Sequence, residues 1–299
     1  MISGSLVAIV TPFKNGAVDE GKLVELVERQ IREGTRGIVP CGTTGESATL
    51  SREEHEKVIR ITVETVNGRV PVLAGTGSNS TDEALLMTKY AKEIGADASL
   101  LITPYYNKPT QDGLFKHFEL IAKKVDIPIV LYNVPGRTGV NLLPETAAYL
   151  SQIDNIIAIK EASGSLDQVS QIIGSSDLMV ISGDDSLTLP MLALGAKGVI
   201  SVVANIVPGR LAAMLSAWEN GNIERARAIH LELFDLMKGM FIETNPIPVK
   251  EALKLMGLLN GEFRLPLCRM TEANLEKLKS LLGKYNLLTE CSGKCGGVS

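Results

Sequence analysis

The sequence predicts an α/β fold, a (β/α)8 TIM barrel with a C-terminal helical extension. Eight short runs of apolar, β-branched residues recur along the chain, and each is followed by a turn and a stretch of helical period. Runs that are apolar throughout are typical of parallel strands buried on both faces. Eight such runs favour a closed barrel over a doubly wound sheet. A chain of 299 residues is long enough for one barrel and an appendage.

The predicted strands are, in chain order, SLVAIVTP, GIVPCG, VPVLAGTG, ASLLITPYY, IPIVLYNVP, IIAIKEAS, LMVISGDD and GVISVVAN. The first of them lies in MISGSLVAIVTPF, which lacks the basic region and the cleavage site of a signal peptide. Pro12 ends this run too early for a membrane span. We therefore expect a first strand here and no association with a membrane.

An amphipathic helix is predicted between the first two strands. Its apolar stripe consists of Leu23, Leu26, Val27 and Ile31. This spacing places the four side chains on one helix face that packs on a core.

Two later helices are predicted from capping boxes, Ser51 with Glu54 and Ser80 with Glu83. In a capping box the serine hydroxyl and the glutamate carboxylate each accept a hydrogen bond from a backbone N–H that has no partner within the helix. The two serines therefore mark helix starts.

The last third of the chain keeps a helical period without further strands. Its apolar positions include Ala226, Ile229, Leu233, Leu236, Met237 and Met240. We assign residues 1–220 to the barrel with the catalytic site, 221–288 to a helical extension and 289–299 to a disordered tail. Cys291 and Cys295 lie in this tail, where a metal site would need ligands that the neighbouring sequence lacks.

The composition is that of a soluble globular protein. The chain is 45% hydrophobic and 21% charged, with a formal net charge of −4. This balance provides no basic footprint for nucleic acid. Four scattered cysteines are too few for a disulfide framework in a chain of this length, which indicates a cytoplasmic protein.

Lys160 interrupts the apolar run NIIAIKEAS near the end of the predicted sixth strand. Active sites of (β/α)8 barrels lie at the C-terminal ends of the strands. Apolar surroundings disfavour the ammonium form and leave a neutral amine, which can form a Schiff base with a ketone. The alternative is a structural lysine paired with an acidic residue. Glu161 should face the helices instead, because adjacent strand residues point to opposite faces.

Other strand ends carry polar side chains that fit the same chemistry. Tyr132 ends the fifth strand and can relay protons, or it can simply fill the barrel mouth. Thr43 and Thr44 lie in the GTTGES turn, whose amides can bind a carboxylate or reflect ordinary turn chemistry. Arg137 is either a bidentate carboxylate ligand or a surface arginine.

The motifs together closely resemble a known family. They are GTTGES, TPYYNKP, YNVPGRTG, IKEASG, SGDD, GVISV and NPIPVK. The chain resembles the dihydrodipicolinate synthase / N-acetylneuraminate lyase family, and within it the 4-hydroxy-tetrahydrodipicolinate synthases. The likeness runs from GSLVAIVTPF to about residue 285 and leaves out only the cysteine-bearing tail.

The resemblance implies roles for four catalytic residues. Lys160 would form the Schiff base with pyruvate, and Tyr132 would donate and accept protons. Thr43 would join Tyr132 in a proton relay, which Tyr106 from a neighbouring subunit would complete. A shared site requires at least a dimer, and the resemblance implies a homotetramer built of two dimers.

The resemblance also implies substrate contacts. Pyruvate's carboxylate would be held at Thr44, with backbone contacts near Gly183 and Ile200, and Arg137 would receive the carboxylate of aspartate semialdehyde. The pyruvate enamine would attack the aldehyde, and ring closure would release the lysine. This step of lysine (diaminopimelate) biosynthesis implies no metal and no dissociable cofactor. Asp184 and Asp185 are interpreted as turn formers rather than ion ligands.

Lysine-inhibited members of the family bind lysine at a dimer interface. The matching positions are Ser47, Ala48, Arg52, His55, Asn79, Glu83 and Tyr105. Arg52 departs from the histidine that is frequent there, and its charge can repel the ammonium groups of lysine or attract its carboxylate. We expect weak or absent inhibition, because ligand sites tolerate a misplaced buried charge poorly.

Two alternatives stay open from the sequence. A sister aldolase or lyase acting on N-acetylneuraminate or a 2-keto-3-deoxy sugar acid would keep Lys160 and Tyr132. Arg137 within GRTG and the double threonine of GTTGE favour the synthase. A non-catalytic sugar-acid-binding protein on the same fold would not need Lys160, Tyr132, Thr43 and Arg137 together, and all four are present.

Overall fold

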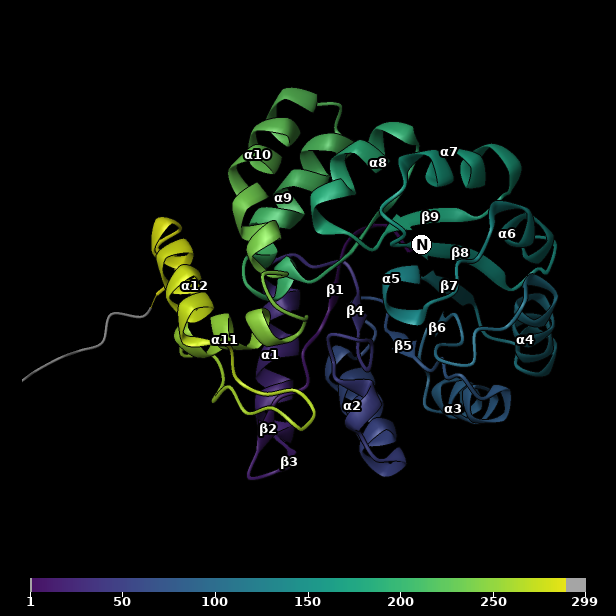
Figure 1. Ribbon diagram of the computed structural model, residues 1–299, viewed down its shortest axis with the longest axis horizontal. Helices are drawn as coiled ribbons and strands as arrows, with labels where there is room; N and C mark the ends of the chain where they lie inside the picture. The colour runs from purple at the N-terminus through teal and green to yellow at the C-terminus, as the bar shows by residue number, and fades with distance from the viewer. Residues whose placement is uncertain (1, 289–299) are drawn as a thin grey trace, which may run out of the picture.

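The computed structural model describes residues 2–288 and contains the predicted barrel (Figure 1). Each of the eight apolar runs forms one parallel strand. The strands are β1 (Gly4–Ala8), β4 (Ile38–Val39), β5 (Leu73–Gly75), β6 (Ala98–Ile102), β7 (Ile129–Asn133), β8 (Ile156–Glu161), β9 (Met179–Ser182) and β10 (Gly198–Ser201). The prediction of a (β/α)8 barrel is confirmed.

The strands form one sheet in the order β4-β1-β10-β9-β8-β7-β6-β5. The two end strands meet through a parallel bridge between Ile38 and Val72. Hydrogen bonds flank this bridge, from the Ile38 N–H to the Pro71 carbonyl and from the Gly75 N–H to the Pro40 carbonyl, each over 3.0 Å. These contacts close the sheet into a barrel.

A short antiparallel hairpin that the sequence analysis missed follows β1. It pairs β2 (Phe13–Lys14) with β3 (Ala17–Val18). Asn15 and Gly16 form its turn with φ of 54° and 79°. Both values suit an Asn-Gly turn that requires positive φ at each central residue.

Helices follow the strands and surround the barrel (Figure 1). The α-helices are α1 (Glu20–Arg32), α2 (Arg52–Val66), α3 (Thr81–Glu93), α4 (Gln111–Lys124), α5 (Pro135–Thr138), α6 (Pro144–Leu150), α7 (Leu166–Ser175), α8 (Thr188–Leu194) and α9 (Pro208–Glu219). The 3₁₀ helices are η1 (Ser47–Thr49), η2 (Asp185–Leu187) and η3 (Val203–Asn205).

Helix α1 packs the predicted face on the barrel with one exception. Leu23, Leu26 and Val27 are buried, but Ile31 is only half-buried. Gln30 is buried in this face instead, and its amide donates to the Ala204 carbonyl over 2.8 Å. The buried face thus includes Gln30 in place of Ile31, because the Gln30 amide has a buried hydrogen-bond partner.

One of the two predicted capping boxes is complete. At the start of α2, Ser51 accepts from the Glu54 N–H and the Glu54 carboxylate accepts from the Ser51 N–H. At the start of α3, Ser80 accepts from the Glu83 N–H, but the Glu83 carboxylate accepts from the Ser78 hydroxyl instead. The prediction of a second capping box is therefore wrong, because Ser78 takes the carboxylate.

The barrel interior is a separate apolar cluster. It includes Leu6, Ala8, Val39, Leu73, Ala98, Leu100, Val130, Tyr132, Ala158, Ile181 and Ile200. Alternate residues of each strand point inward, so Ala158 faces the interior while Ile159 packs against the surrounding helices. Lys160, two residues after Ala158, has the same orientation as Ala158.

Three more helices follow α9, namely α10 (Ile223–Gly239), α11 (Ile247–Leu255) and α12 (Glu272–Lys284). Helix α10 packs on α9, and α12 lies against both α10 and α11 (Figure 1). All six apolar positions predicted between 226 and 240 are buried. The predicted tail, with Cys291 and Cys295, lies outside the described residues. In the described chain, every helix is too short or too polar to cross a membrane.

Candidate active site

Lys160 and Tyr132 lie side by side inside the barrel. They occupy paired positions on the neighbouring strands β8 and β7, and each is only 6% exposed. The Nζ of Lys160 lies 4.1 Å from the centroid of the Tyr132 ring. The structure thus brings together the predicted nucleophile and the predicted proton donor.

Glu161 points away from Lys160, as predicted. Its carboxylate accepts from Asn133 Nδ2 at 3.0 Å, from Gln168 Nε2 at 3.2 Å and from the Ser163 N–H at 2.7 Å. These partners satisfy the buried carboxylate on the helix side of the strand. Glu161 therefore does not pair with the amine of Lys160, as it would if Lys160 were a structural lysine paired with its neighbour.

Gly183 leaves space for the end of the Lys160 side chain. A Cβ at position 183 would lie 3.0 Å from Lys160 Cε and 2.7 Å from Ala162 Cβ. A side chain at position 183 would therefore displace Ala162 and crowd the end of the lysine. Ile200, on β10, is buried in the barrel interior.

The GTTGES turn places Thr44 next to Asn245, a residue to which the sequence analysis assigned no role. Asn245 Nδ2 donates to Thr44 Oγ1 over 3.0 Å, and both residues are buried. Because this bond uses Thr44 Oγ1 as an acceptor, the hydroxyl proton of Thr44 stays available for an acceptor from solution. Thr43 is half-buried in the same turn.

Arg137 contacts the same asparagine from the exposed helix α5. Its Nη2 donates to the Asn245 carbonyl over 3.1 Å. Asn245 thus touches both predicted carboxylate ligands, Thr44 through its side chain and Arg137 through its main chain. NPIPVK is one of the motifs that carry the resemblance, but the sequence alone does not show this contact, because Asn245 and Thr44 are 201 residues apart.

A buried ion pair between Glu46 and Lys250 lies behind the turn. Both side chains are fully buried, and Lys250 Nζ also donates to the Thr11 carbonyl over 3.1 Å. Burial lowers the pKa of Lys250, and the negative charge of Glu46 opposes this shift. Neither residue is among the predicted site residues.

Asp185 is more than the turn former that the sequence analysis expected. It is buried, and its Oδ2 accepts from the Val202 and Val203 N–H groups at 3.1 and 2.9 Å. Burial raises its pKa to about 6, against hydrogen bonds from Ser201 and these amides, and the nearby Asp184 adds to the rise. The carboxyl therefore joins the ends of β9 and β10.

The raised pKa of Asp185 predicts a pH-dependent stability difference. The folded protein binds this proton more tightly than the unfolded chain, so the contribution of Asp185 to the free energy of unfolding falls as pH rises from about 4 to about 6. Asp185→Asn removes this pH-dependent contribution. Its stability relative to the wild type should rise over that window by roughly 3 kcal/mol, at about 1.4 kcal/mol per pKa unit. Urea unfolding of both proteins at pH 4 and pH 7 measures the change, and a constant difference would contradict it.

Tyr106 does not pack into its own barrel. It is 89% exposed with a φ of 71°, and the adjacent Tyr105 is 36% exposed. Nearby, Asn107 Nδ2 donates to the Asn79 carbonyl over 2.9 Å and ties this loop to the start of α3. The two aromatic rings thus lie on an accessible loop, as a contact with a second subunit requires.

The positions implied for lysine binding occur on neighbouring elements. They are Ser47 and Ala48 in η1, Arg52 and His55 in α2, Asn79 before α3, Glu83 in α3 and Tyr105 after β6. His55 Nε2 pairs with the Gly75 carbonyl at 2.7 Å, and burial lowers its pKa while Glu83 opposes the shift. The Arg52 side chain is 57% exposed and pairs with Glu56 at 2.8 Å. Arg52 is thus accessible in the single chain, and weak or absent inhibition by lysine at a dimer interface stays a prediction.

The histidines lie in separate helices, His55 in α2, His117 in α4 and His230 in α10. His117 Nδ1 pairs with Thr81 Oγ1 at 2.9 Å, and burial lowers its pKa to about 4. Within the described residues, no three histidine, cysteine or acidic side chains gather in a way that could hold a metal ion. His117 is thus a neutral, structural side chain near pH 7.

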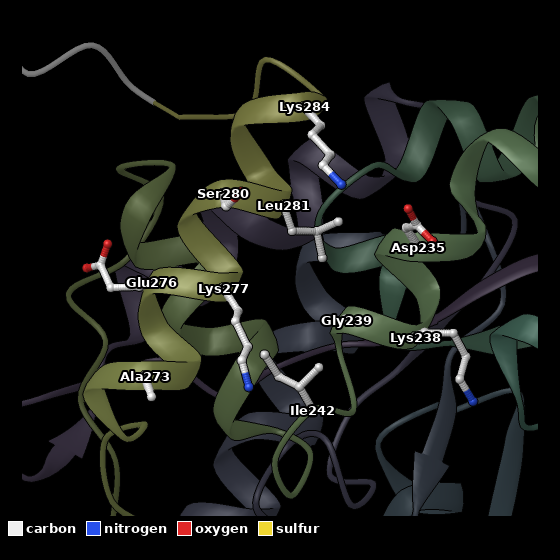
Figure 2. Close-up of a pocket in the computed structure, with 10 residues that line it drawn as sticks. All are labelled: Asp235, Lys238, Gly239, Ile242, Ala273, Glu276, Lys277, Ser280, Leu281 and Lys284. Atoms are coloured by element: carbon white, nitrogen blue, oxygen red, sulfur yellow. The ribbon is translucent and has the colours of Figure 1, made fainter.

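A groove of about 590 Å³ lies away from these residues, between α10 and α12 (Figure 2). It is lined by Asp235, Lys238, Gly239, Ile242, Ala273, Glu276, Lys277, Ser280, Leu281 and Lys284. A Cβ at Gly239 would lie 2.2 Å from Leu281, so the helices touch at the floor of the groove. Its lining carries charges of both signs and none of the predicted site residues, so we assign the active site to the barrel mouth.

Comparison with known proteins agrees with the family resemblance of the sequence. Residues 1–285 match the model of the Dihydrodipicolinate synthetase family. A 4-hydroxy-tetrahydrodipicolinate synthase from Geobacter sp. (strain M21) is 59% identical over 290 residues, which cover 96% of this chain and all of the relative.

Solved structures agree with this likeness. A dihydrodipicolinate synthase from Aquifex aeolicus has a TM-score of 0.95 at 51% identity and covers 97% of this chain and all of its own. A monomeric dihydrodipicolinate synthase variant has a TM-score of 0.94 at 45% identity and covers 96% of this chain and 97% of its own.

Proposed function

The chain belongs to the dihydrodipicolinate synthetase family, and on this basis we propose that it condenses pyruvate with aspartate semialdehyde to 4-hydroxy-tetrahydrodipicolinate. The enzyme is a lyase that acts through a Schiff base, in lysine (diaminopimelate) biosynthesis. The observation that carries the proposal is the buried amine of Lys160, held 4.1 Å from the Tyr132 ring centroid inside the barrel.

The first chemical step joins Lys160 to pyruvate. The amine adds to the keto carbon, the carbonyl oxygen takes up protons and leaves as water, and an imine forms. Tyr132, beside Lys160, is the proposed proton donor, and Thr43 in the turn at residues 42–47 would pass protons to it. Loss of a proton from the methyl group then gives the enamine that attacks the aldehyde.

The two carboxylates of the substrates would bind at separate places. Thr44 can donate its hydroxyl proton to the carboxylate of pyruvate, because Asn245 already donates to its oxygen. Gly183, directly after β9, and Ile200 in β10 would line the same site. Arg137, on the exposed helix α5, would bind the carboxylate of aspartate semialdehyde through its planar fork of donors.

A coupled assay tests this function directly. Pyruvate and aspartate semialdehyde should be consumed together, while N-acetylneuraminate and 2-keto-3-deoxy sugar acids should not be cleaved. Borohydride with pyruvate should trap a reduced adduct on Lys160. Cleavage of a sugar acid in place of the condensation would assign the chain to a sister enzyme, and absence of any adduct would favour a binding protein.

Assembly into at least a dimer is part of the proposal. The 89% exposure of Tyr106 supports a role in a neighbour's site, and two such dimers would form a tetramer. We expect Lys160→Ala and Tyr106→Phe each to lose most activity, and mixed dimers of the two variants to regain some. If Tyr106 acts across the interface, a mixed dimer has one site in which Lys160 of one subunit meets Tyr106 of the other. Neither variant alone can form such a site.

The complementation experiment is read together with sedimentation. Co-expressed variants with separate affinity tags should give active mixed dimers, whereas each variant alone should not. Inactive mixed dimers, or an active wild-type monomer at assay concentration, would contradict a shared site. The monomeric relative makes this control necessary.

A further inference from the structure

The Glu46–Lys250 ion pair joins the C-terminal segment to the turn at residues 42–47. Lys250, in α11, also donates to the Thr11 carbonyl over 3.1 Å. The Thr11 hydroxyl in turn donates to the Gly45 carbonyl over 2.6 Å. The turn is therefore held at residues 45 and 46 from two sides, by Thr11 in the segment after β1 and by α11.

Glu46 has a backbone conformation that its residue type rarely adopts. Its φ and ψ are 54° and 37°, in the left-handed region, and its N–H donates to the Thr43 carbonyl over 3.1 Å. A residue other than glycine keeps such a conformation only where its surroundings impose it. The ion pair with Lys250 is such a constraint, and it acts three residues from Thr43.

The Glu46–Lys250 ion pair is buried beside two aromatic rings. One oxygen of Glu46 accepts from Lys250, while Oε2 is buried without a hydrogen-bond partner within residues 2–288. Lys250 Nζ lies 4.4 and 5.1 Å from the ring centroids of Phe13 and Phe263. A buried ion pair adds little stability over apolar residues of similar volume, so stability alone does not explain its presence.

We propose that Glu46 and Lys250 are positioning residues, which hold the turn at 42–47 in the shape that binds the carboxylate of the keto-acid substrate. The inference rests on the proposed function, since it concerns the pyruvate site. The C-terminal segment contacts the turn twice, through Lys250 at Glu46 and through Asn245 at Thr44 over 3.0 Å. Loss of the ion pair frees the backbone at Glu46 to relax and moves the Thr44 hydroxyl.

The test measures pyruvate binding without the second substrate. Borohydride trapping on Lys160 is titrated with pyruvate, and the concentration that gives half-maximal adduct is determined by mass spectrometry. Lys250→Met and Glu46→Gln should each raise this concentration at least about 10-fold, because small displacements of a substrate ligand have effects of this order. Adduct formation at saturating pyruvate should survive.

Arg264→Met is the matched control. Arg264 also joins the C-terminal segment to the barrel, by an ion pair with Glu54 and hydrogen bonds to the Thr49 and Gly16 carbonyls, but it does not contact the turn's threonines. This variant should melt at a lower temperature and keep the pyruvate dependence of the wild type. An equal rise in Arg264→Met and Lys250→Met would overturn the positioning role.

The double variant Glu46→Leu/Lys250→Met keeps the test decisive if single variants fail to fold. Two apolar side chains remove both charges and restore stability, but they cannot hold the turn through the Thr11 carbonyl. We expect a stable protein with impaired pyruvate binding. A double variant with the pyruvate dependence of the wild type would refute the inference. No adduct in the wild type itself would instead refute the proposed function, and this inference with it.

Discussion

Lys160→Ala should fold normally and lose Schiff-base formation. The substitution removes the only nucleophile that we propose for the reaction, so turnover should fall by at least about 10³-fold. The fold should survive because the variant removes an amine that is costly to bury, and the surrounding strands keep their backbone pairing. The coupled assay measures turnover, and mass spectrometry after borohydride reduction measures the adduct.

Lys197→Ala is the control for this experiment, because Lys197 is an exposed lysine just before β10. It should keep the turnover and the adduct of the wild type. Near-normal turnover of Lys160→Ala would mean that the reaction does not pass through this amine, and the mechanism proposed here would have to be abandoned.

Arg137→Ala should damage the use of aspartate semialdehyde far more than the binding of pyruvate. Hydrogen bonds to a charged group contribute roughly 1.5–3 kcal/mol, so the Michaelis constant for the semialdehyde should rise about 10- to 100-fold. Pyruvate adduct formation should be unchanged. Arg137→Lys should recover little, because an ammonium group cannot reproduce the planar fork of a guanidinium.

The measurement varies one substrate at a time in the coupled assay and titrates the adduct separately. Equal damage to both substrates would instead indicate that Arg137 supports Asn245, whose carbonyl accepts from it over 3.1 Å. In that case the adduct titration of Arg137→Ala would resemble that of an Asn245 variant.

The barrel and two central residues of the candidate site, Lys160 and Tyr132, could be predicted from local patterns. Strands buried on both faces require apolar runs, and eight such runs are visible in the sequence without any knowledge of their contacts. Strand alternation then placed Lys160 inward and Glu161 outward, as the structure has them. Because active sites of such barrels lie at the strand ends, Tyr132 could be predicted as a site residue. It lies beside Lys160 on the neighbouring strand.

Local patterns failed at two places, once because a nearby side chain competes for the same partner and once because the element is very short. Ser80 with Glu83 has the spacing of a capping box, yet Ser78 takes the carboxylate. The hairpin β2–β3 is too short to show an alternating pattern, although Asn15 and Gly16 are a known turn signal.

Only the tertiary structure decided what holds the turn at residues 42–47. Asn245 and Lys250 contact Thr44 and Glu46 across 201 and 204 residues of chain. In the sequence, a lysine in a helix and a glutamate in a turn are typical of solvent-exposed positions. Their burial depends on how α11 packs over the end of the barrel, and hydrophobic periodicity, which describes each segment alone, carries no information about that packing.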